Sequence, residues 1–430
     1  MVPRLATALT GPLLDLERRI LAAETAIEHW LRGWWQAHTP PFYASVDLRN
    51  AGFKLAPVDT NLFPGGFNNL NPVFLPLCVQ AAMTAVDRVC PEAKNLLLIP
   101  ENHTRNQHYL LNLARLAAIL RHTGLNVRLG SLLPEIIAPT ILDLPDGQQL
   151  TLEPLRRLGP EGRRLGLDDF DPCAVLLNND LSAGVPPLLQ GLEGQYIIPP
   201  LSAGWHARRK SHHFAAYQEV AKEFGDLLDI DPWLINPEFE VCGKINFQEQ
   251  SAELRGEDCL ATSVDTLLYR IRAKYKEYGI DSPPFVIVKA DAGTYGMGIM
   301  TVRDASEVKD LSRRQRNKMA VGKGGSQVHE VMIQEGVPTV ETVNEGTAEP
   351  VVYMIDRYVV GGFYRVHGER GVDENLNAPG MHFEPLAFET GCTLPDSCLG
   401  PDAPPNRFYA YGVVARLALL AACLELERNP

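Results

Sequence analysis

The sequence predicts an α/β protein in two parts: an N-terminal sheet domain over residues 1–215 and an α+β region over residues 216–430. Three observations support this prediction. The chain has 430 residues, which is too long for one ordinary hydrophobic core. A strand–helix–strand pattern begins near residue 95, and a glycine-rich hairpin occupies residues 285–302. Hydrophobic residues make up 45% of the chain and charged residues 21%, a balance typical of globular proteins.

The composition disfavours several kinds of partner and location. The net charge of −12 argues against nucleic acid or an anionic membrane as a partner. The eight cysteines are scattered without a CxxC pair, so we expect no disulfide framework, no structural zinc and a cytoplasmic location. The N-terminus lacks a signal peptide, and the apolar run from Tyr411 to Leu424 contains Arg416 and is too short to span a bilayer. The sequence leaves a homo-oligomer open.

The first elements are a helix and a polar segment. Apolar residues recur every three or four positions over residues 12–37, which predicts one amphipathic helix ending before Pro40. Residues 45–70 are dense in side chains that make directed hydrogen bonds, and we interpret them as a loop that binds a small zwitterion such as an amino acid. A surface loop with Asx turns is the alternative. The candidate substrate residues are Asp47, Arg49, Asn50, Lys54, Asp59 and Asn61.

The segment that follows predicts a parallel sheet of Rossmann-like type. Residues 95–100 form a strand, residues 107–122 a helix and residues 126–129 a second strand. Ligands of such sheets bind beyond the carboxyl ends of the strands, which makes Asn102 and Arg105 further substrate candidates. No GxGxxG follows the first strand, so an NAD-type enzyme is disfavoured. Asp146-Gly147 marks a hairpin, and further strands begin near residues 174 and 196.

The hairpin at residues 285–302 is the strongest candidate for phosphate binding. An apolar strand leads to Lys289, a glycine-rich turn follows, and Ile299 to Val302 form a returning strand. Glycines let backbone N–H groups approach phosphates closely, and the lysine adds a point charge. A tight hairpin with a surface lysine is the alternative interpretation. The glycines of the turn are Gly293, Gly296 and Gly298.

Three further segments surround this hairpin in the sequence. Lys244 lies about 45 residues before it, in a short apolar stretch. A strand over residues 331–337 ends in a polar turn, and residues 350–366 form a second hairpin with Arg365 on its return. Residues 374–380 form a turn with one carboxylate and two amides.

This order of motifs resembles the nucleotide-binding half of ATP-grasp ligases. Over essentially its whole length, the chain resembles the glutamate–cysteine ligase family of proteobacteria. The segments that carry this closer resemblance are SVDLRNAGFKLAPVDTNLFPGGFNNLNP, LLLIPENHTRN and VIVKADAGTYGMGIMTV. It implies a Rossmann-like domain before an ATP-grasp-like region, ATP and Mg²⁺ as cofactors, and glutamate and cysteine as substrates. An acylphosphate of glutamate would react with the cysteine amine to give γ-glutamylcysteine.

The resemblance also implies roles for single residues. Lys244 and Lys289 would contact the α- and β-phosphates under the glycine loop, and Arg365 would lie near the γ-phosphoryl group. The implied contacts of adenine and ribose are Gln334, Glu335, Val337 and Glu341. Carboxylate and amide oxygens suit Mg²⁺, and the candidates are Asp356, Glu374, Asn375 and Asn377. The sequence departs from the ATP-grasp pattern here, because the turn at residues 374–377 has no Glu-x-Asn.

Two other functions remain open at this point. Another ATP-grasp ligase, with a different acid or amine, would share every motif named above. A non-catalytic nucleotide-binding protein would be expected to lose Lys289 or the candidate carboxylates, and both are present.

Overall fold

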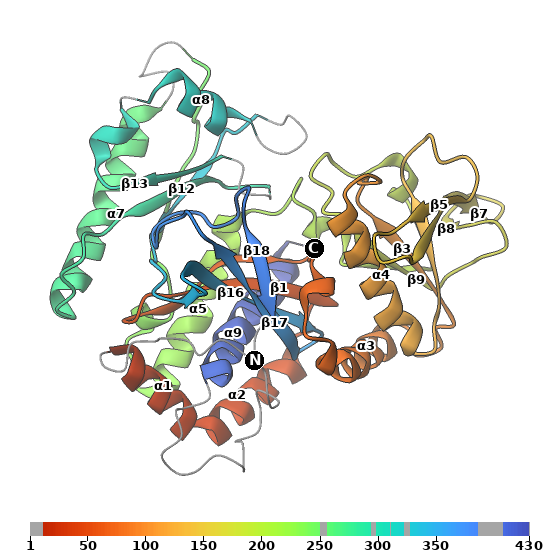
Figure 1. The fold of residues 1–430 in the computed structure, drawn as a ribbon, viewed down its shortest axis with the longest axis horizontal. Helices are drawn as coiled ribbons and strands as arrows, with labels where there is room; N and C mark the ends of the chain where they lie inside the picture. The colour runs from red at the N-terminus through yellow and green to blue at the C-terminus, as the bar shows by residue number, and fades with distance from the viewer. Residues whose placement is uncertain are drawn as a thin grey trace.

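The computed structural model describes residues 12–249, 256–293, 298–309, 311–321, 327–385 and 407–429. Figure 1 shows three groups of elements: a central sheet with helices beneath it, a sheet with α3 and α4 on one side, and a smaller sheet with α7 and α8 on the other. The α/β fold class is confirmed. Gly296, predicted to cover phosphates, lies outside the described residues.

The central sheet is antiparallel, with the strand order β18-β17-β16-β1-β2 and β15 paired to β16. Its strands are β1 (Tyr43–Asn50), β2 (Leu55–Asn61), β15 (Thr342–Val343), β16 (Gly346–Ile355), β17 (Tyr358–His367) and β18 (His382–Pro385). Half of the segment expected as a polar loop is therefore two strands, whose alternation places polar side chains on one face. The sheet joins strands from both sides of residue 215, so the predicted division into two parts does not follow the strand pairing.

The helices beneath this sheet form the main core. They are α1 (Pro12–Ala22), α2 (Glu24–Ala37), α5 (Lys210–Leu228) and α9 (Arg407–Arg428). The helix expected over residues 12–37 is interrupted at Ala23. The long apolar helix α9 packs against α5, β1 and β2. Two segments are long and apolar enough to cross a membrane, Pro72–Val89 and Phe408–Arg428, but 89% of the second is buried in this core.

The second sheet confirms the predicted strand–helix–strand unit. It runs β10-β9-β3-β4-β6-β5, parallel except for β5. Its strands are β3 (Asn95–Pro100), β4 (Asn126–Ser131), β5 (Thr140–Asp143), β6 (Gln149–Pro154), β9 (Ala174–Asn178) and β10 (Tyr196–Ile198). Helices α3 (Leu75–Val89) and α4 (Gln107–His122) belong to this part, with a ribbon of β7 (Arg156–Leu158) and β8 (Arg164–Gly166). Cys90 and Cys173, which are 83 residues apart in the sequence, form a disulfide. The scattered cysteines had not led us to expect this pairing.

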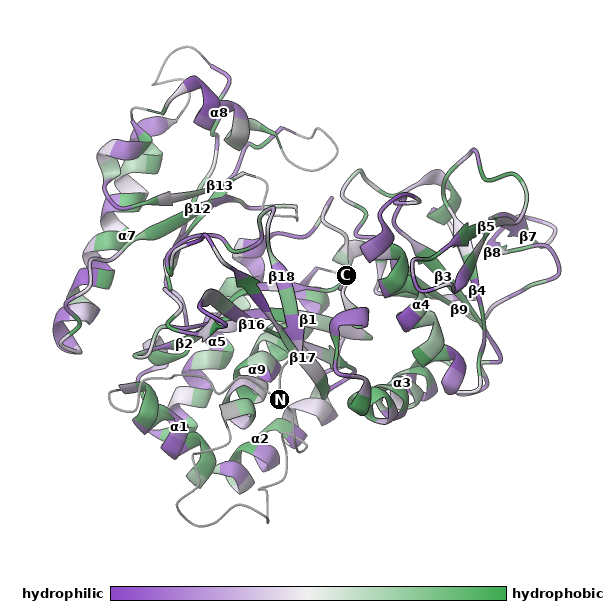
Figure 2. Ribbon diagram, viewed as in Figure 1, coloured by the Kyte–Doolittle hydropathy of each residue, from purple (hydrophilic) through white to green (hydrophobic). Residues whose placement is uncertain are grey.

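The third sheet contains the predicted glycine hairpin. It runs β11-β14-β12-β13, all antiparallel, and α7 packs on it. Its elements are β11 (Phe239–Cys242), α7 (Glu257–Glu277), β12 (Val286–Ala290), β13 (Ile299–Val302), α8 (Arg313–Ala320) and β14 (Val331–Glu335). Helix α8 begins at a capping box, in which Ser312 and Gln315 each accept from the backbone N–H of the other. Figure 2 shows α8 as largely hydrophilic.

Short 3₁₀ turns connect these elements. Their bounds are η1 (Phe67–Asn69), η2 (Pro72–Phe74), η3 (Pro187–Leu189), η4 (Leu201–Ala203), η5 (Pro232–Leu234) and η6 (Ala305–Val308).

A buried ion pair joins the central sheet to the third sheet. Lys54, in the turn between β1 and β2, donates to Glu335 at the end of β14 over 2.6 Å. The side chains are 0% and 1% exposed. The lysine Nζ also lies 4.0 Å from the centre of the Trp233 ring. A buried charge needs its partner, since an unpaired ion in this position loses its hydration without compensation.

We therefore expect Lys54 and Glu335 to be strongly coupled in stability. Lys54→Met and Glu335→Met should each destabilise the protein, and the double variant should be less destabilised than the sum, with a coupling of about 2 kcal/mol. Urea unfolding of the four proteins measures this coupling. Additive effects within about 0.5 kcal/mol would contradict it. Lys222→Met, a change on α5 outside the pair, serves as the control.

Candidate active site

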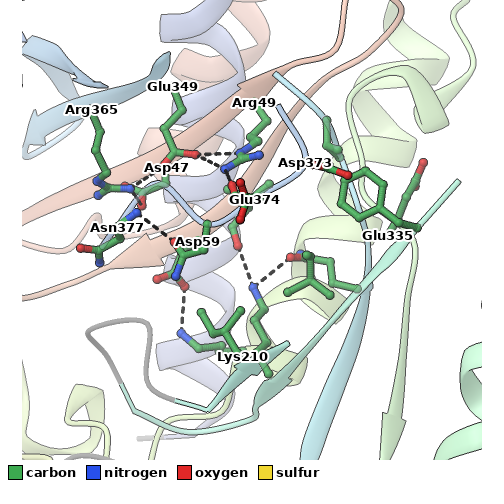
Figure 3. Close-up of a pocket in the computed structure, with 18 of the residues that line it drawn as sticks. Asp47, Arg49, Asp59, Lys210, Glu335, Glu349, Arg365, Asp373, Glu374 and Asn377 are labelled. Carbon is green, nitrogen blue, oxygen red and sulfur yellow. Dashed lines mark hydrogen bonds and ion pairs between the residues drawn. The ribbon is translucent and has the colours of Figure 1, made fainter. Parts of the chain in front are cut away.

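A row of charged side chains lies on one face of the central sheet. Asp47 on β1 pairs with Asp59 on β2 and with Val351 on β16, and Glu349 on β16 pairs with Arg365 on β17. Side chains two positions apart on a strand point to the same side, so the antiparallel register brings these charges together from four strands. Figure 3 shows them facing one pocket.

Arg365 is the cation at the centre of this row. Its Nη1 donates to Asp47 over 2.8 Å and to Glu349 over 2.6 Å, whereas its buried Nε has no hydrogen-bond partner. Burial opposes the charge of Arg365, but the two carboxylates outweigh burial and raise its pKa above the usual range. The arginine is thus fully charged and fixed, with one N–H unused.

Two lysines flank Asp59. Lys210 donates to this carboxylate over 2.9 Å. Burial alone would raise the pKa of Asp59, but Lys210, Lys289 and Arg208 hold it below its usual range. Lys289 donates to the carbonyl of Val58 over 2.8 Å and to Gln334 over 2.9 Å. Burial lowers the pKa of Lys289 to about 7.

The row lines a cavity of about 870 Å³, part of it open to solvent. The same cavity has the apolar side chains Val58, Phe285, Ile287, Ile299 and Val337, which we call the apolar slot. Gln334 and Glu335 line it as well, and the buried Nε2 of Gln334 has no partner. Apolar side chains beside a cluster of cations fit a nucleotide with its base in the apolar slot. Gly293, with φ of +95°, lines the same cavity.

A second cavity of about 1300 Å³ adjoins the first. Asp47, Asp59, Arg365 and Asn377 line both. One wall of the second cavity is aromatic, where the Phe363 ring lies 5.3 Å from Tyr353 and 4.9 Å from Phe383. The opposite wall is polar and includes Asn61, Glu101, His103, Tyr109, Asn178 and Asp180. Such a mixture suits a small polar ligand with an apolar portion.

Two buried asparagines that line the second cavity hold a neighbouring loop in place. Asn112 on α4 accepts from the backbone N–H groups of Gly66 and Phe67 over 2.8 and 3.0 Å. Its amide donates to Asn178, whose own amide donates to the carbonyl of Pro64. The loop of residues 63–69 is therefore held against the second sheet, in the region where the sequence predicted a ligand.

Most of the predicted site residues meet in the first cavity. The predicted residues that line it are Asp47, Arg49, Asp59, Lys289, Gly293, Gln334, Glu335, Val337, Arg365, Glu374, Asn375 and Asn377. Asn61 lines only the second cavity. Lys244 lines an adjacent hollow that shares Gly293 with the first.

Six predicted positions line neither cavity. Asn50 and Glu341 are buried together against Tyr411, so neither reaches substrate or ribose. The ammonium group of Lys54 is buried in its ion pair with Glu335. Asp356 lies at the far turn of its hairpin, paired with Arg88 over 2.7 Å, and is not placed to bind magnesium. Two loop residues are exposed and line neither cavity, namely Asn102 and Arg105.

Arg49 lines the first cavity, but its nitrogens already have protein acceptors. Nε donates to Glu349 over 2.7 Å, and the other two donate to the carbonyls of Val372 and Glu374 over 3.1 and 2.7 Å. Arg49 thus fixes the segment of residues 371–377, which lines part of the first cavity. This differs from the expected direct contact with an amino acid.

We expect Arg49→Lys to lower kcat/KM for ATP about tenfold while leaving KM for the amino acids within about threefold. Lysine keeps the charge beside Glu349 but loses the fork that holds both carbonyls, and tenfold corresponds to about 1.4 kcal/mol. Steady-state kinetics with each substrate varied in turn checks this result. A rise confined to the KM of an amino acid would instead restore the direct contact. Arg18→Lys, at an exposed pair with Asp15 on α1, is the matched control.

Metal binding has weaker support among these residues. In the part of the chain that the structure describes, no group of three or more His, Cys, Asp or Glu side chains is placed to hold a metal ion. Glu374, Asn375 and Asn377 offer oxygens to the first cavity, but Glu374 already accepts from Arg370 and from the N–H of Gly371. The donor set fits an ion that arrives already bound to phosphate oxygens and takes only one or two protein ligands.

Several lining residues were missed from the sequence. Glu349, Phe285, Ile287 and Asp373 line the first cavity, and Tyr353, Asn178 and Asp180 line the second. The alternation of residues 349, 351 and 353 along β16 carried a signal for Glu349. The alternation alone does not show which face of β16 lines the cavity. That becomes clear only from the pairing of β16 with β1, about 300 residues away in the chain.

Comparison with known proteins identifies the family. The family model described as glutamate-cysteine ligase matches residues 17–426. A crystal structure from Methylobacillus flagellatus KT, whose protein is provisionally named γ-glutamylcysteine synthetase, is 65% identical, with a TM-score of 0.91 and full coverage of both chains. No curated protein matches. D-alanyl-alanine synthetase A from Vibrio cholerae is 12% identical over 75% of this chain and 81% of its own, at a TM-score of 0.33 that supports no comparison of fold. The chain belongs to the glutamate–cysteine ligase family.

Proposed function

We propose that this ligase activates glutamate where its two cavities meet. The first cavity holds ATP, with the base in the apolar slot and the phosphates toward Lys289, Lys210 and Gly293. The second holds the amino acids. The γ-carboxylate of glutamate attacks the γ-phosphoryl group, and the cysteine amine displaces phosphate to give γ-glutamylcysteine, ADP and phosphate. Family membership supports this reaction. The residues that line both cavities support its placement at their junction.

Electrostatics supports this placement of the two steps. Phosphoryl transfer needs fixed cations where negative charge collects, and Arg365 lines both cavities. A fixed guanidinium does not reorganise during the reaction, so its stabilisation is available at the transition state. In this proposal the phosphates are bound by Lys289 and Lys210, which also hold the pKa of Asp59 below its usual range.

Magnesium would accompany ATP in this proposal. Bound to the phosphates, it would offset their charge, with Glu374, Asn375 or Asn377 as its protein oxygens. We further propose an ATP-grasp arrangement for the central and third sheets and a Rossmann-like one for the second. A cytoplasmic enzyme without nucleic acid or membrane partners fits the composition.

An assay of partial reactions tests the proposal. Phosphate release is measured with ATP and magnesium plus glutamate alone, cysteine alone, or both, and again with glutamate plus hydroxylamine, which traps acylphosphates as hydroxamates. We expect full turnover only with both amino acids and a hydroxamate from glutamate alone. Equal turnover with another acid–amine pair would reassign the substrates. ATP binding without phosphate release under any of these conditions would refute the enzyme assignment.

A further inference from the structure

The proposed second step needs a proton acceptor. The amine of a free amino acid is mostly protonated at neutral pH, but only the neutral amine attacks an acylphosphate. We propose that Asp47 is the general base that removes a proton from the attacking amine. This inference rests on the proposed function and assigns a role to one residue within it.

The position of Asp47 is what singles it out. It lines both cavities, so one carboxylate faces the phosphoryl end of the first and the amino-acid end of the second. Its Oδ2 accepts from Arg365 over 2.8 Å, which fixes the side chain beside the cation proposed to hold the reacting group. The side chain is 20% exposed, so a ligand in the cavity reaches it.

Other carboxylates in the row are less suited. Asp59 also lines both cavities, but Lys210 occupies it and its pKa is held below the usual range. Glu349 lies between two arginines, does not line the second cavity, and has a lowered pKa, since Arg49 and Arg365 outweigh the effect of burial. Burial instead raises the pKa of Asp47, which makes it the best proton acceptor of the three.

Charged and titratable groups on neighbouring strands oppose one another at Asp47. Arg365 on β17 favours its ionised form, whereas Glu349 on β16 and Asp59 on β2 disfavour it. Tyr353 on β16 and Lys289 on β12 also interact electrostatically with Asp47. The carboxylate is therefore ionised enough to accept a proton and basic enough to hold it briefly.

The proton and electron balance of the step is complete. One proton passes from the ammonium group to a carboxylate oxygen of Asp47. The freed lone pair attacks the acyl carbon, a C–N bond forms, and the bond from that carbon to the phosphate oxygen breaks with its electrons leaving on phosphate. The second N–H proton is lost from the tetrahedral intermediate to the departing phosphate. Asp47 then returns its proton to solvent.

Comparing two nucleophiles tests this role. Hydroxylamine is already neutral at pH 7, so it needs no general base, whereas cysteine does. For each protein, the ratio of the rate of γ-glutamylcysteine formation to the rate of hydroxamate formation is measured at saturating ATP and glutamate. We expect Asp47→Asn to lower this ratio by about 10²-fold or more, the usual contribution of a general base. Arg365 keeps its bond to Glu349 in this variant.

A matched variant separates this role from a general loss of charge. Asp59→Asn removes the other carboxylate shared by both cavities, and we expect its two rates to fall together with the ratio within about threefold of wild type. A ratio unchanged in Asp47→Asn, or lowered equally in Asp59→Asn, would overturn the inference. If Asp47→Asn does not fold, as judged by its thermal shift with ATP, Asp47→Ser serves for the same ratio. Failure of the wild type to form hydroxamate from glutamate would instead refute the proposed function.

Discussion

Arg365→Lys is expected to lower kcat about 10²- to 10³-fold, the usual cost of losing a fixed donor at a developing charge. Lysine keeps a positive charge near Asp47 and Glu349, but it presents a single flexible ammonium group instead of a rigid fork. The effect should fall on kcat rather than on KM for ATP, because the base and the other phosphates are held elsewhere. Initial rates of phosphate release with all substrates saturating measure it.

The lysine variant is chosen because alanine would do more than remove a contact. Arg365→Ala would leave Asp47 and Glu349 buried side by side without their shared cation, and that cost in stability would confuse the kinetic result. Arg357→Lys provides a matched control, since Arg357 lies at the far turn of the same hairpin and stacks on Tyr358. A kcat within about threefold of wild type for Arg365→Lys, with normal folding, would remove Arg365 from the reaction.

Local sequence patterns predicted the second and third sheets well. Residues 95–129 carry a strand–helix–strand pattern, and residues 285–302 a strand, a glycine turn and a returning strand, and both form as expected. These elements depend on periodicity and turn chemistry within about 35 residues of chain. Lys289 and Gly293 were found for the same reason, because a lysine at the end of a buried strand next to glycines is a local signal.

The central sheet could not be derived in this way. Its strands β1 and β2 are separated from β16 by about 300 residues in the chain. Their alternating polar residues are equally typical of a loop. Asn50 and Lys54 illustrate the consequence. Both are polar residues in a polar segment, yet one turns into the core toward Tyr411 and the other pairs with Glu335 on another sheet. Their partners are non-local, so no window of sequence around them distinguishes a buried ion pair from a ligand contact.

Lys289→Met is expected to reduce turnover about 10³-fold without reducing stability. Lys289 is 6% exposed, and its ammonium group donates to a carbonyl and an amide rather than to a carboxylate, so its charge is costly in the free enzyme. Burial lowers its pKa from 10.5 to about 7. The folded state therefore binds fewer protons than the unfolded state between these values, and stability rises with pH there. Methionine removes this cost while nearly keeping the volume, so unfolding at pH 7 should show a variant at least as stable as wild type.

The same lowered pKa predicts how ATP affinity depends on pH. Phosphates bind the charged lysine, and raising the pH through about 7 removes that charge from the free enzyme. ATP affinity should therefore fall above pH 7, by up to tenfold per pH unit, and binding at pH 8 should take up a proton. Calorimetry in two buffers of different ionisation enthalpy measures this uptake. ATP's own phosphate titrates near this range, so the decisive quantity is the difference between wild type and Lys289→Met. Equal proton uptake and equal pH dependence in the two proteins would place Lys289 away from the phosphates, because only a lysine that gains its charge on binding carries both effects.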